Sequence, residues 1–340
     1  MQIGSPAAWN VTLSILQPPE PPRFAWPSPT AQQNTAAPST PAKEPAAEKT
    51  TSSIGLSPVV QAFLLRLQEL GMTHISGTDG HDRLSGWSSS LVDGGDGNDA
   101  IDVWSGSVVD AGAGDDSIRA WSESAVYGGA GNDQIDIWSD SAAHGGDGDD
   151  TIRAWGNTVV FGGNGNDVIS AWSESQVDGG AGNDVISAWS NSRVSGGEGD
   201  DQISVSSSGF IDGGSGNDTL RVDNDSVASG GAGDDTIVAD RGSTVLFSAG
   251  DGKDTVYAGR DTTLRLGEGL TAGNMQLAVS GSTATISFGD GSDQITLHLG
   301  PGSPVTLAFA DGTTTEIKAD RPAIRNDAVS AEASSLCTRR

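Results

Sequence analysis

The chain has 340 residues, of which 35% are hydrophobic and 5% are aromatic, which is little for a conventional globular core. Its formal net charge is −27, with 45 acidic residues against 18 basic ones, and it contains 48 glycines. Because this composition combines electrostatic self-repulsion with high backbone entropy, we expect the chain to stay largely unfolded unless a cation neutralises it. A nucleic-acid partner is not expected, since phosphates would be repelled and no basic stripe offsets the charge.

Targeting and crosslinking signals are sparse. The single cysteine, Cys337, excludes an intramolecular disulfide. The apolar stretch 11–16 is short, lacks a preceding basic region and is soon followed by proline, so a Sec signal peptide is not expected. No run of 18 apolar residues occurs, so no transmembrane helix is expected either.

The first two segments differ in composition. Residues 1–53 are rich in Pro, Ala and Ser, which predicts a disordered leader. Within 54–75, Ser57 is a candidate N-cap, Pro58 suits the first turn and Gly71 is a stop signal, so we predict an amphipathic helix that caps the segment that follows. Its apolar face would consist of Val60, Phe63, Leu64, Leu67 and Leu70.

Residues 76–260 form an array in which one aspartate recurs every 17 residues, with a final step of 19. Such a strict period predicts a solenoid. The recurring aspartates are Asp82, Asp99, Asp116, Asp133, Asp150, Asp167, Asp184, Asp201, Asp218, Asp235 and Asp254. Each unit contains two turns and two short strands, so each is expected to form one coil. With strands about 4.8 Å apart, ten coils would span roughly 50 Å.

Each 17-residue unit has two unequal halves, as in 179–187 and 188–194. The first half reads Gly-Gly-x-Gly-(Asn/Asp)-Asp-x-Ile-x and the second reads Ala-Trp-Ser-x-Ser-x-Val. We predict two facing core ladders: Ile101, Ile118, Ile135, Ile152, Ile169, Ile186, Ile203, Leu220 and Ile237 on one side, and Val109, Val126, Val160, Val177, Val194 and Ile211 on the other. A core only two side chains wide would need bound ions to fold.

The glycine-rich motif favours a calcium site. Closely spaced glycines can adopt positive φ and turn their carbonyl oxygens toward one point. Calcium accepts six to eight oxygen ligands, whereas no His or Cys recurs in the motif to favour zinc. The alternative interpretation is that the aspartates only accept hydrogen bonds from backbone amides in Asx-turns.

The motif resembles the haemolysin-type calcium-binding nonapeptide repeat of RTX proteins, over about 76–259. The resemblance implies an all-β parallel β-roll in which multiple Ca²⁺ ions lie between successive turns, bound by the motif Asp and by glycine carbonyls. It assigns the metal-ligand role to the recurring aspartates named above. The terminal copies depart from the motif at Thr78, His81, Ala249 and Lys253, so the end sites should be weakest. Because the second half of each unit lacks the motif, we expect one calcium row, with the Trp-Ser-x-Ser turn closing the opposite edge.

Seven tryptophans recur in the same register, at Trp87, Trp104, Trp121, Trp138, Trp155, Trp172 and Trp189. Two interpretations stay open: the indoles stack over the metal-free edge and cap the core, or they form an outward strip that binds a sugar polymer, ice or another repetitive surface. A nearby column alternates Asp102, Arg119, Asp136 and Arg153 in successive coils. We interpret it as a set of ion pairs that holds the register.

The C-terminal part completes the architecture. Residues 261–320 alternate apolar and polar positions, which predicts a β-rich cap, and 321–340 are expected to be a flexible tail. No catalytic motif appears, and the four histidines, His74, His81, His144 and His298, have no recurring partner, so an enzyme is not expected.

The functional expectation follows from the repeats. The resemblance implies secretion from a Gram-negative bacterium into a calcium-rich exterior, by a type I route or, given the Ser/Pro/Thr-rich leader, a type III route. We therefore expect an extracellular calcium-binding structural or interaction module. The alternatives are a carbohydrate- or ice-surface binder that uses the tryptophans, with a polysaccharide or a host cell surface as partner, and a secreted effector.

Overall fold

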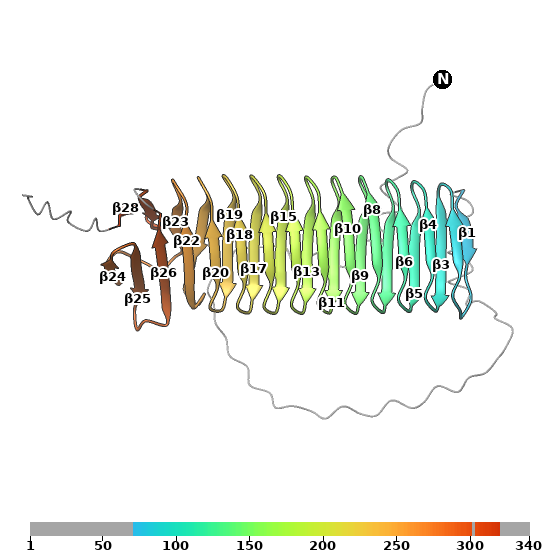
Figure 1. The fold of residues 1–340 in the computed structure, drawn as a ribbon, viewed down its shortest axis with the longest axis horizontal. Coiled ribbons are helices and arrows are strands. Elements are labelled where there is room, and N and C mark those ends of the chain that lie inside the picture. The colour runs from blue at the N-terminus through green and yellow to red at the C-terminus, as the bar shows by residue number, and fades with distance from the viewer. Residues whose placement is uncertain (1–70, 301–302, 320–340) are drawn as a thin grey trace, which may run out of the picture. The chain divides into compact units, whose positions relative to one another are not determined.

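The computed structural model describes residues 71–300 and 303–319, and every regular element in these ranges is a β-strand. The strands form two 14-stranded sheets, and successive strands from β1 to β24 alternate between them (Figure 1). The predicted all-β parallel roll is thereby confirmed. No helix long and apolar enough to cross a membrane is found among the described residues.

In each repeat, the strand of sheet A runs into the glycine-rich edge of the coil, and the strand of sheet B runs into the edge that carries the tryptophans. Sheet A contains, in spatial order, β1 (Thr73–Ser76), β3 (Ser90–Asp96), β5 (Val108–Ala113), β7 (Ala125–Ala130), β9 (Ala142–Asp147), β11 (Val159–Asn164), β13 (Gln176–Ala181), β15 (Arg193–Glu198), β17 (Phe210–Ser215), β19 (Val227–Ala232), β21 (Thr244–Phe247), β23 (Thr263–Leu266), β27 (Val305–Ala308) and β28 (Thr314–Ile317). Sheet B contains β2 (Arg83–Gly86), β4 (Ala100–Val103), β6 (Ser117–Ala120), β8 (Gln134–Trp138), β10 (Thr151–Trp155), β12 (Val168–Ala171), β14 (Val185–Ala188), β16 (Gln202–Val205), β18 (Thr219–Val222), β20 (Thr236–Ala239), β22 (Lys253–Ala258), β26 (Asp293–Leu299), β25 (Thr283–Phe288) and β24 (Met275–Ser280).

The 17-residue period sets the register. Ile135, Ile152 and Ile169 are direct partners on neighbouring parallel strands, so equivalent positions form straight columns along the roll. Side chains alternate between the core and the outer face, as expected for strands. Both predicted core ladders are buried, at 2% exposure or less.

The structure adds a third buried column that the sequence analysis missed. Two residues after each core Ile lies another inward position, occupied by Val103, Ala120, Ile137, Ala154, Ala171, Ala188, Val205, Val222 and Ala239. The two-residue step from the Ile ladder could have revealed it. Its side chains range from Ala to Ile, and each is at most 3% exposed.

The ends of the roll differ from the repeat. β26 and β27 still pair parallel with β22 and β23. β25 pairs antiparallel with β26 and with β24, and β28 pairs antiparallel with β27, so these three strands no longer follow the parallel coil. The predicted N-terminal helix falls largely on residues 54–70, outside the described residues. Beyond the predicted stop at Gly71, residues Thr73–Ser76 at the end of the 54–75 capping segment form β1 of sheet A. The predicted leader at 1–53 and tail at 321–340 also lie outside the described residues.

A buried hydroxyl column closes the edge that carries the tryptophans. It consists of Ser90, Ser107, Ser124, Ser141, Thr158, Ser175, Ser192, Ser226, Ser243 and Thr262, each at most 4% exposed. The Ser124 N–H donates to Ser141 Oγ at 3.1 Å, and Ser141 Oγ donates to the Trp121 carbonyl at 3.2 Å. Neutral hydroxyls with these partners need no ion, which explains how one edge closes without the glycine motif.

Replacing Ser141 with Ala is expected to destabilise the folded protein by about 1–3 kcal/mol, because the buried Ser124 N–H loses its acceptor. The exposed Ser139 provides a matched control, and Ser139→Ala should change stability by less than about 0.5 kcal/mol. Urea unfolding of both variants in calcium measures the difference. Equal stability would show that the hydroxyl column does not hold this edge.

Candidate metal centre

The recurring aspartates form one buried column at the glycine-rich edge. Ten of them, from Asp99 to Asp254 in steps of one coil, are at most 3% exposed, while Asp82 at the first coil is half-buried. Asp99 directly precedes β4, and each of the next eight directly precedes its own strand of sheet B, whereas Asp254 lies within β22. The structure therefore brings all the predicted metal-ligand residues into one row.

One oxygen of each carboxyl group binds the backbone of the neighbouring coil. The Asp116 N–H donates to Asp133 Oδ1 at 2.8 Å, and the Asp133 N–H donates to Asp150 Oδ1 at 2.7 Å. The same bond recurs from Asp82 through to Asp254. The aspartates do satisfy backbone amides, as the alternative interpretation supposed, but through Oδ1 they do so between coils. Asp82 in the first coil also accepts the Thr78 N–H of its own turn, with Oδ2.

The second oxygen has a different environment. In the described ranges, Oδ2 is buried and has no hydrogen-bond partner in Asp99, Asp116, Asp133, Asp150, Asp167, Asp184, Asp201, Asp218 and Asp235. A buried carboxylate oxygen without a partner is costly, and nine in one row repel one another. The row therefore has the donor chemistry of a site for a hard cation.

Backbone carbonyls lie close to the same oxygens. A Cβ added to Gly128 would collide with both Asp133 Oδ2 and the Gly145 carbonyl oxygen, and one added to Gly145 would collide with Asp150 Oδ2 and the Gly162 carbonyl oxygen. A carboxylate oxygen of one coil and a carbonyl of the next thus converge on the first glycine of most motifs, whereas Ala111 occupies that position in one coil. This convergence fits calcium, which takes carboxylate and carbonyl ligands together.

The second and third glycines are required by backbone conformation. In one representative coil they are Gly129 and Gly131, with φ of 112° and 130°. Side chains are strained at such angles, and a Cβ at either position would also collide with the backbone of the preceding coil. These glycines let successive turns stack closely enough for oxygens of two coils to share one ion.

Burial shifts the titration of the row. It raises the pKa of Asp116, Asp167 and Asp201 to about 6, that of Asp133, Asp150, Asp184 and Asp218 to about 7, and that of Asp254 to about 8. The backbone hydrogen bond to each carboxyl group opposes the shift, while neighbouring carboxylates add to it in most coils. Without a cation, many of these groups would be protonated near neutral pH.

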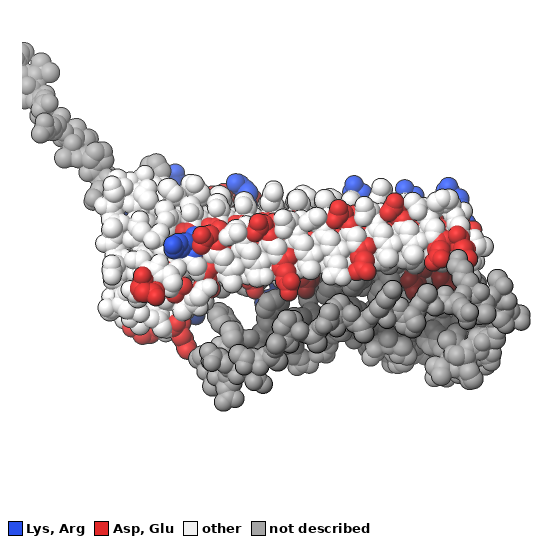
Figure 2. Space-filling view, turned by 90° about the horizontal axis from the view of Figure 1, so that it is seen from below, with Lys and Arg blue, Asp and Glu red and all other residues white. Residues whose placement is uncertain are grey.

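A second polar row, which the sequence analysis missed, runs along the outside of the same edge. Here the residue before each buried Asp accepts a hydrogen bond in the opposite direction. The Asn132 N–H donates to Asp115 Oδ1, and the Asp149 N–H donates to Asn132 Oδ1, both at 2.9 Å. Each turn is therefore tied to both neighbours. Acidic side chains recur along the face of the roll shown in Figure 2, consistent with the chain's net charge of −27.

The seven tryptophans form a stacked ladder on the outer face of sheet B. Their ring centroids are 4.4–5.8 Å apart and their planes differ by 5–14°. The rings stack on one another, as the first interpretation expected, yet they point away from the core; binding of a repetitive surface stays a prediction. The exposed fraction is 76% for Trp87, 46% for Trp104, 37% for Trp121 and 39% for Trp189.

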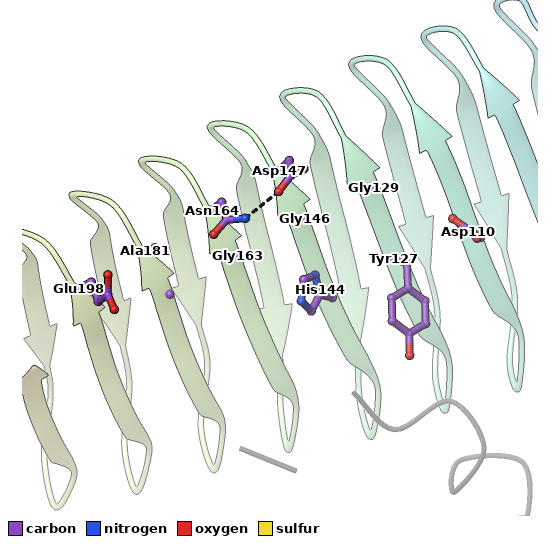
Figure 3. Close-up of a pocket in the computed structure, with 11 residues that line it drawn as sticks. Asp110, Tyr127, Gly129, His144, Gly146, Asp147, Gly163, Asn164, Ala181 and Glu198 are labelled. Carbon is purple, nitrogen blue, oxygen red and sulfur yellow. Dashed lines mark hydrogen bonds between the residues drawn. The ribbon is translucent and has the colours of Figure 1, made fainter. Parts of the chain in front are cut away.

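A groove of about 810 Å³ lies on the outer face of sheet A (Figure 3). Its lining residues include Gly129, Gly146, Gly163 and Gly180, flanked by Tyr127 and His144 on one side and by Asp147, Asn164 and Glu198 on the other. The Asn164 amide donates to Asp147 Oδ1 at 2.7 Å. Burial lowers the pKa of His144, so its ring is neutral near pH 7. The groove contains no recurring ligand set comparable to the Asp row.

The described residues contain no cluster of three or more His, Cys, Asp or Glu side chains that could hold a metal ion by themselves. Any ion in the Asp row would therefore depend on backbone carbonyls as well as on carboxylates from adjacent coils. This dependence on two coils couples ion binding to the formation of the stack.

The comparisons with known proteins agree with this geometry. The family profile of the RTX calcium-binding nonapeptide repeat matches residues 125–136, 154–173, 176–203, 212–246 and 229–262. No curated protein matches the chain significantly. The matched segments carry the glycine motif and most of the buried Asp row, so across residues 125–262 the chain consists of RTX calcium-binding nonapeptide repeats.

Proposed function

We propose that this chain is a secreted calcium-binding module that folds when a single row of Ca²⁺ ions occupies the buried Asp edge, and that it serves as a structural or interaction module and not as an enzyme. The observation that carries the proposal is the row of nine buried Oδ2 atoms without hydrogen-bond partners among the described residues. The RTX repeats support the choice of calcium.

The aspartate oxygens and the glycine carbonyls would have different roles in binding the ions. The motif aspartates would hold the ions with Oδ2, and the glycine carbonyls of the adjacent coil would complete the oxygen shell. Bound calcium would supply the positive charge that offsets the buried carboxylates. The Oδ1 hydrogen bonds would keep successive coils in register, so that one occupied site preorganises the next.

Calcium-dependent folding also suits export. The calcium concentration is low in a bacterial cytosol and higher outside, so the chain would remain unfolded before secretion and fold afterwards. The net charge of −27 favours the unfolded chain until the ions bind. Type I and type III export are both compatible with this behaviour.

Calcium titration of the full chain, followed by far-UV circular dichroism, tests the proposal. We expect a cooperative transition from coil to β-structure with calcium and none at the same concentrations of magnesium, because Mg²⁺ prefers a smaller octahedral shell. A protein that is already folded in metal-free buffer at pH 8, and indifferent to calcium, would refute it.

A second candidate function is binding to a repetitive surface such as a polysaccharide or ice, favoured by the exposed tryptophan ladder. Stacking covers the faces of the interior rings, so these indoles offer mainly their edges. Replacing Trp121, Trp138 and Trp155 with Ser separates the roles. Loss of calcium-induced folding would make the ladder structural, whereas intact folding with loss of polymer binding would support this second function.

A further inference from the structure

The outer face of sheet B carries two parallel columns, one in seven coils and the other in four of those coils. One is the tryptophan ladder. The other consists of Asp102, Arg119, Asp136 and Arg153, which are direct partners on β4, β6, β8 and β10. Arg119 lies 3.6 Å from Asp102 and 3.9 Å from Asp136, and Arg153 lies 3.6 Å from Asp136. The predicted ion pairs between coils are thus present, and they leave the charged groups at the surface.

The exposed indoles give this face a row of apolar ring edges, although the chain as a whole is highly acidic. Trp104 and Trp121 are 46% and 37% exposed, and their ring faces are already covered by stacking. A sugar ring normally packs on an aromatic face, which the interior indoles cannot present. A flat protein surface, in contrast, can cover a continuous row of ring edges and remove their apolar area from water.

The order of the charges identifies a partner surface. Along the roll the signs run minus, plus, minus, plus. A two-fold axis parallel to the strands, midway between the coils of Arg119 and Asp136, would reverse the order of the coils but keep each column facing its own copy. Asp102 would then face the second copy's Arg153, and Arg119 would face the second copy's Asp136. Every charge in the column would meet its opposite.

We propose that this face of sheet B docks a second copy of the same chain in an antiparallel, two-fold arrangement. The same axis places Trp87 opposite the second copy's Trp172, and each indole between them opposite another indole. The outward column beside the charges is uncharged at Ser117, Gln134 and Thr151. These positions therefore place no like charges against each other in the proposed contact. Sheets that face each other pack about 10 Å apart, which an Arg–Asp pair can span.

The size of the face predicts a weak association. Six coils at about 4.8 Å and three outward positions per strand give roughly 400 Å² on each copy. This is about half of what a stable interface buries on each partner. We therefore expect a dimer that forms at tens of micromolar or above and dissociates on dilution, and that weakens at high salt because its charged pairs lie at the surface.

Two double variants with unchanged net charge test the arrangement. Asp136→Arg with Arg153→Asp gives minus, plus, plus, minus, which keeps two of the three ion pairs within the chain but sets like charges against like across the two-fold axis. Arg119→Asp with Asp136→Arg gives minus, minus, plus, plus, which keeps only one pair within the chain but remains complementary across the axis. The two variants thus have opposite effects on the fold's own ion pairs and on the proposed contact.

Sedimentation equilibrium of the full chain in saturating calcium provides the measurement, with circular dichroism to show that each variant is folded. We expect the wild type and the Arg119→Asp/Asp136→Arg variant to dimerise with similar affinity. Dimerisation of the Asp136→Arg/Arg153→Asp variant should be about 10-fold weaker or more. Mixing that variant with Asp102→Arg/Arg119→Asp, whose signs are plus, minus, minus, plus, should restore a heterodimer.

Three outcomes would overturn the proposal. One is a wild type that stays monomeric at several hundred micromolar, and another is a dimer that the Asp136→Arg/Arg153→Asp exchange leaves unchanged. The third is a monomer that binds a polysaccharide through the ladder, which would assign the face to a surface ligand instead. If folding itself proved independent of calcium, the calcium proposal would fail while the dimer could still be measured.

Discussion

Replacing Asp150 with Asn is expected to stabilise the calcium-free protein and to weaken the effect of calcium. Asn retains the Oδ1 atom that accepts the Asp133 N–H, but it removes a buried charge whose pKa is raised to about 7. At pH 8 the substitution should raise the free energy of unfolding of the calcium-free protein by up to about 4 kcal/mol. In calcium the missing carboxylate should raise the calcium concentration needed for half-folding.

The neighbouring residue provides the matched control. Asp149 is exposed and belongs to the outer row, where its Oδ1 accepts the Asn166 N–H. Asp149→Asn preserves that bond and should change calcium dependence little. Urea unfolding distinguishes the two variants when it is measured in calcium at pH 8 and, without calcium, near pH 5, where the calcium-free protein is folded. If Asp150→Asn and Asp149→Asn behaved alike, or if Asp150→Asn lowered stability without calcium, the buried row would be purely a hydrogen-bonding device.

The calcium-free protein is expected to be folded near pH 5 and unfolded near pH 8. The folded-state pKa values of the buried aspartates, about 6 to 8, lie above the unfolded value of 3.8. The folded state therefore binds more protons than the unfolded state between about pH 4 and pH 8, so stability is present at the acid end and is lost as the pH rises. Several such groups act in the same direction, so the free energy of unfolding of the calcium-free protein should fall by many kcal/mol as the pH rises.

Bound calcium should reverse this dependence, because protons compete with the ion for the same oxygens. Circular dichroism and urea midpoints from pH 4.5 to 8.5, in metal-free buffer and in calcium, test the reversal. An Asp150→Asn/Asp184→Asn double variant should have a shallower pH profile without calcium, whereas Asp149→Asn should retain the full slope. Stability that rose with pH in metal-free buffer would contradict the assignment of the raised pKa values.

The repeat made much of the fold predictable. A strict 17-residue period forces equivalent residues into columns, so the Ile and Val ladders and the Asp102 to Arg153 column could be placed before any coordinates. The inward Ala and Val column that includes Val103 was missed, although it follows from the same alternation. The helix predicted to stop at Gly71 lies almost entirely outside the described residues, and β1 (Thr73–Ser76), which pairs with β3 of the next coil, begins after that stop signal.

The sequence by itself determined which residues share a column, because a fixed period and the two-residue alternation of a strand leave little freedom. It also determined the donor chemistry of the glycine-rich edge. Only the tertiary structure decided how each column is used. It showed that Asp133 holds the preceding coil with Oδ1 while Oδ2 lacks a partner, that Ser141 replaces such a group on the other edge, and that the indoles both stack and lie outside. Those outcomes depend on the distance between coils and on the direction of each side chain, which no pattern of residue types specifies.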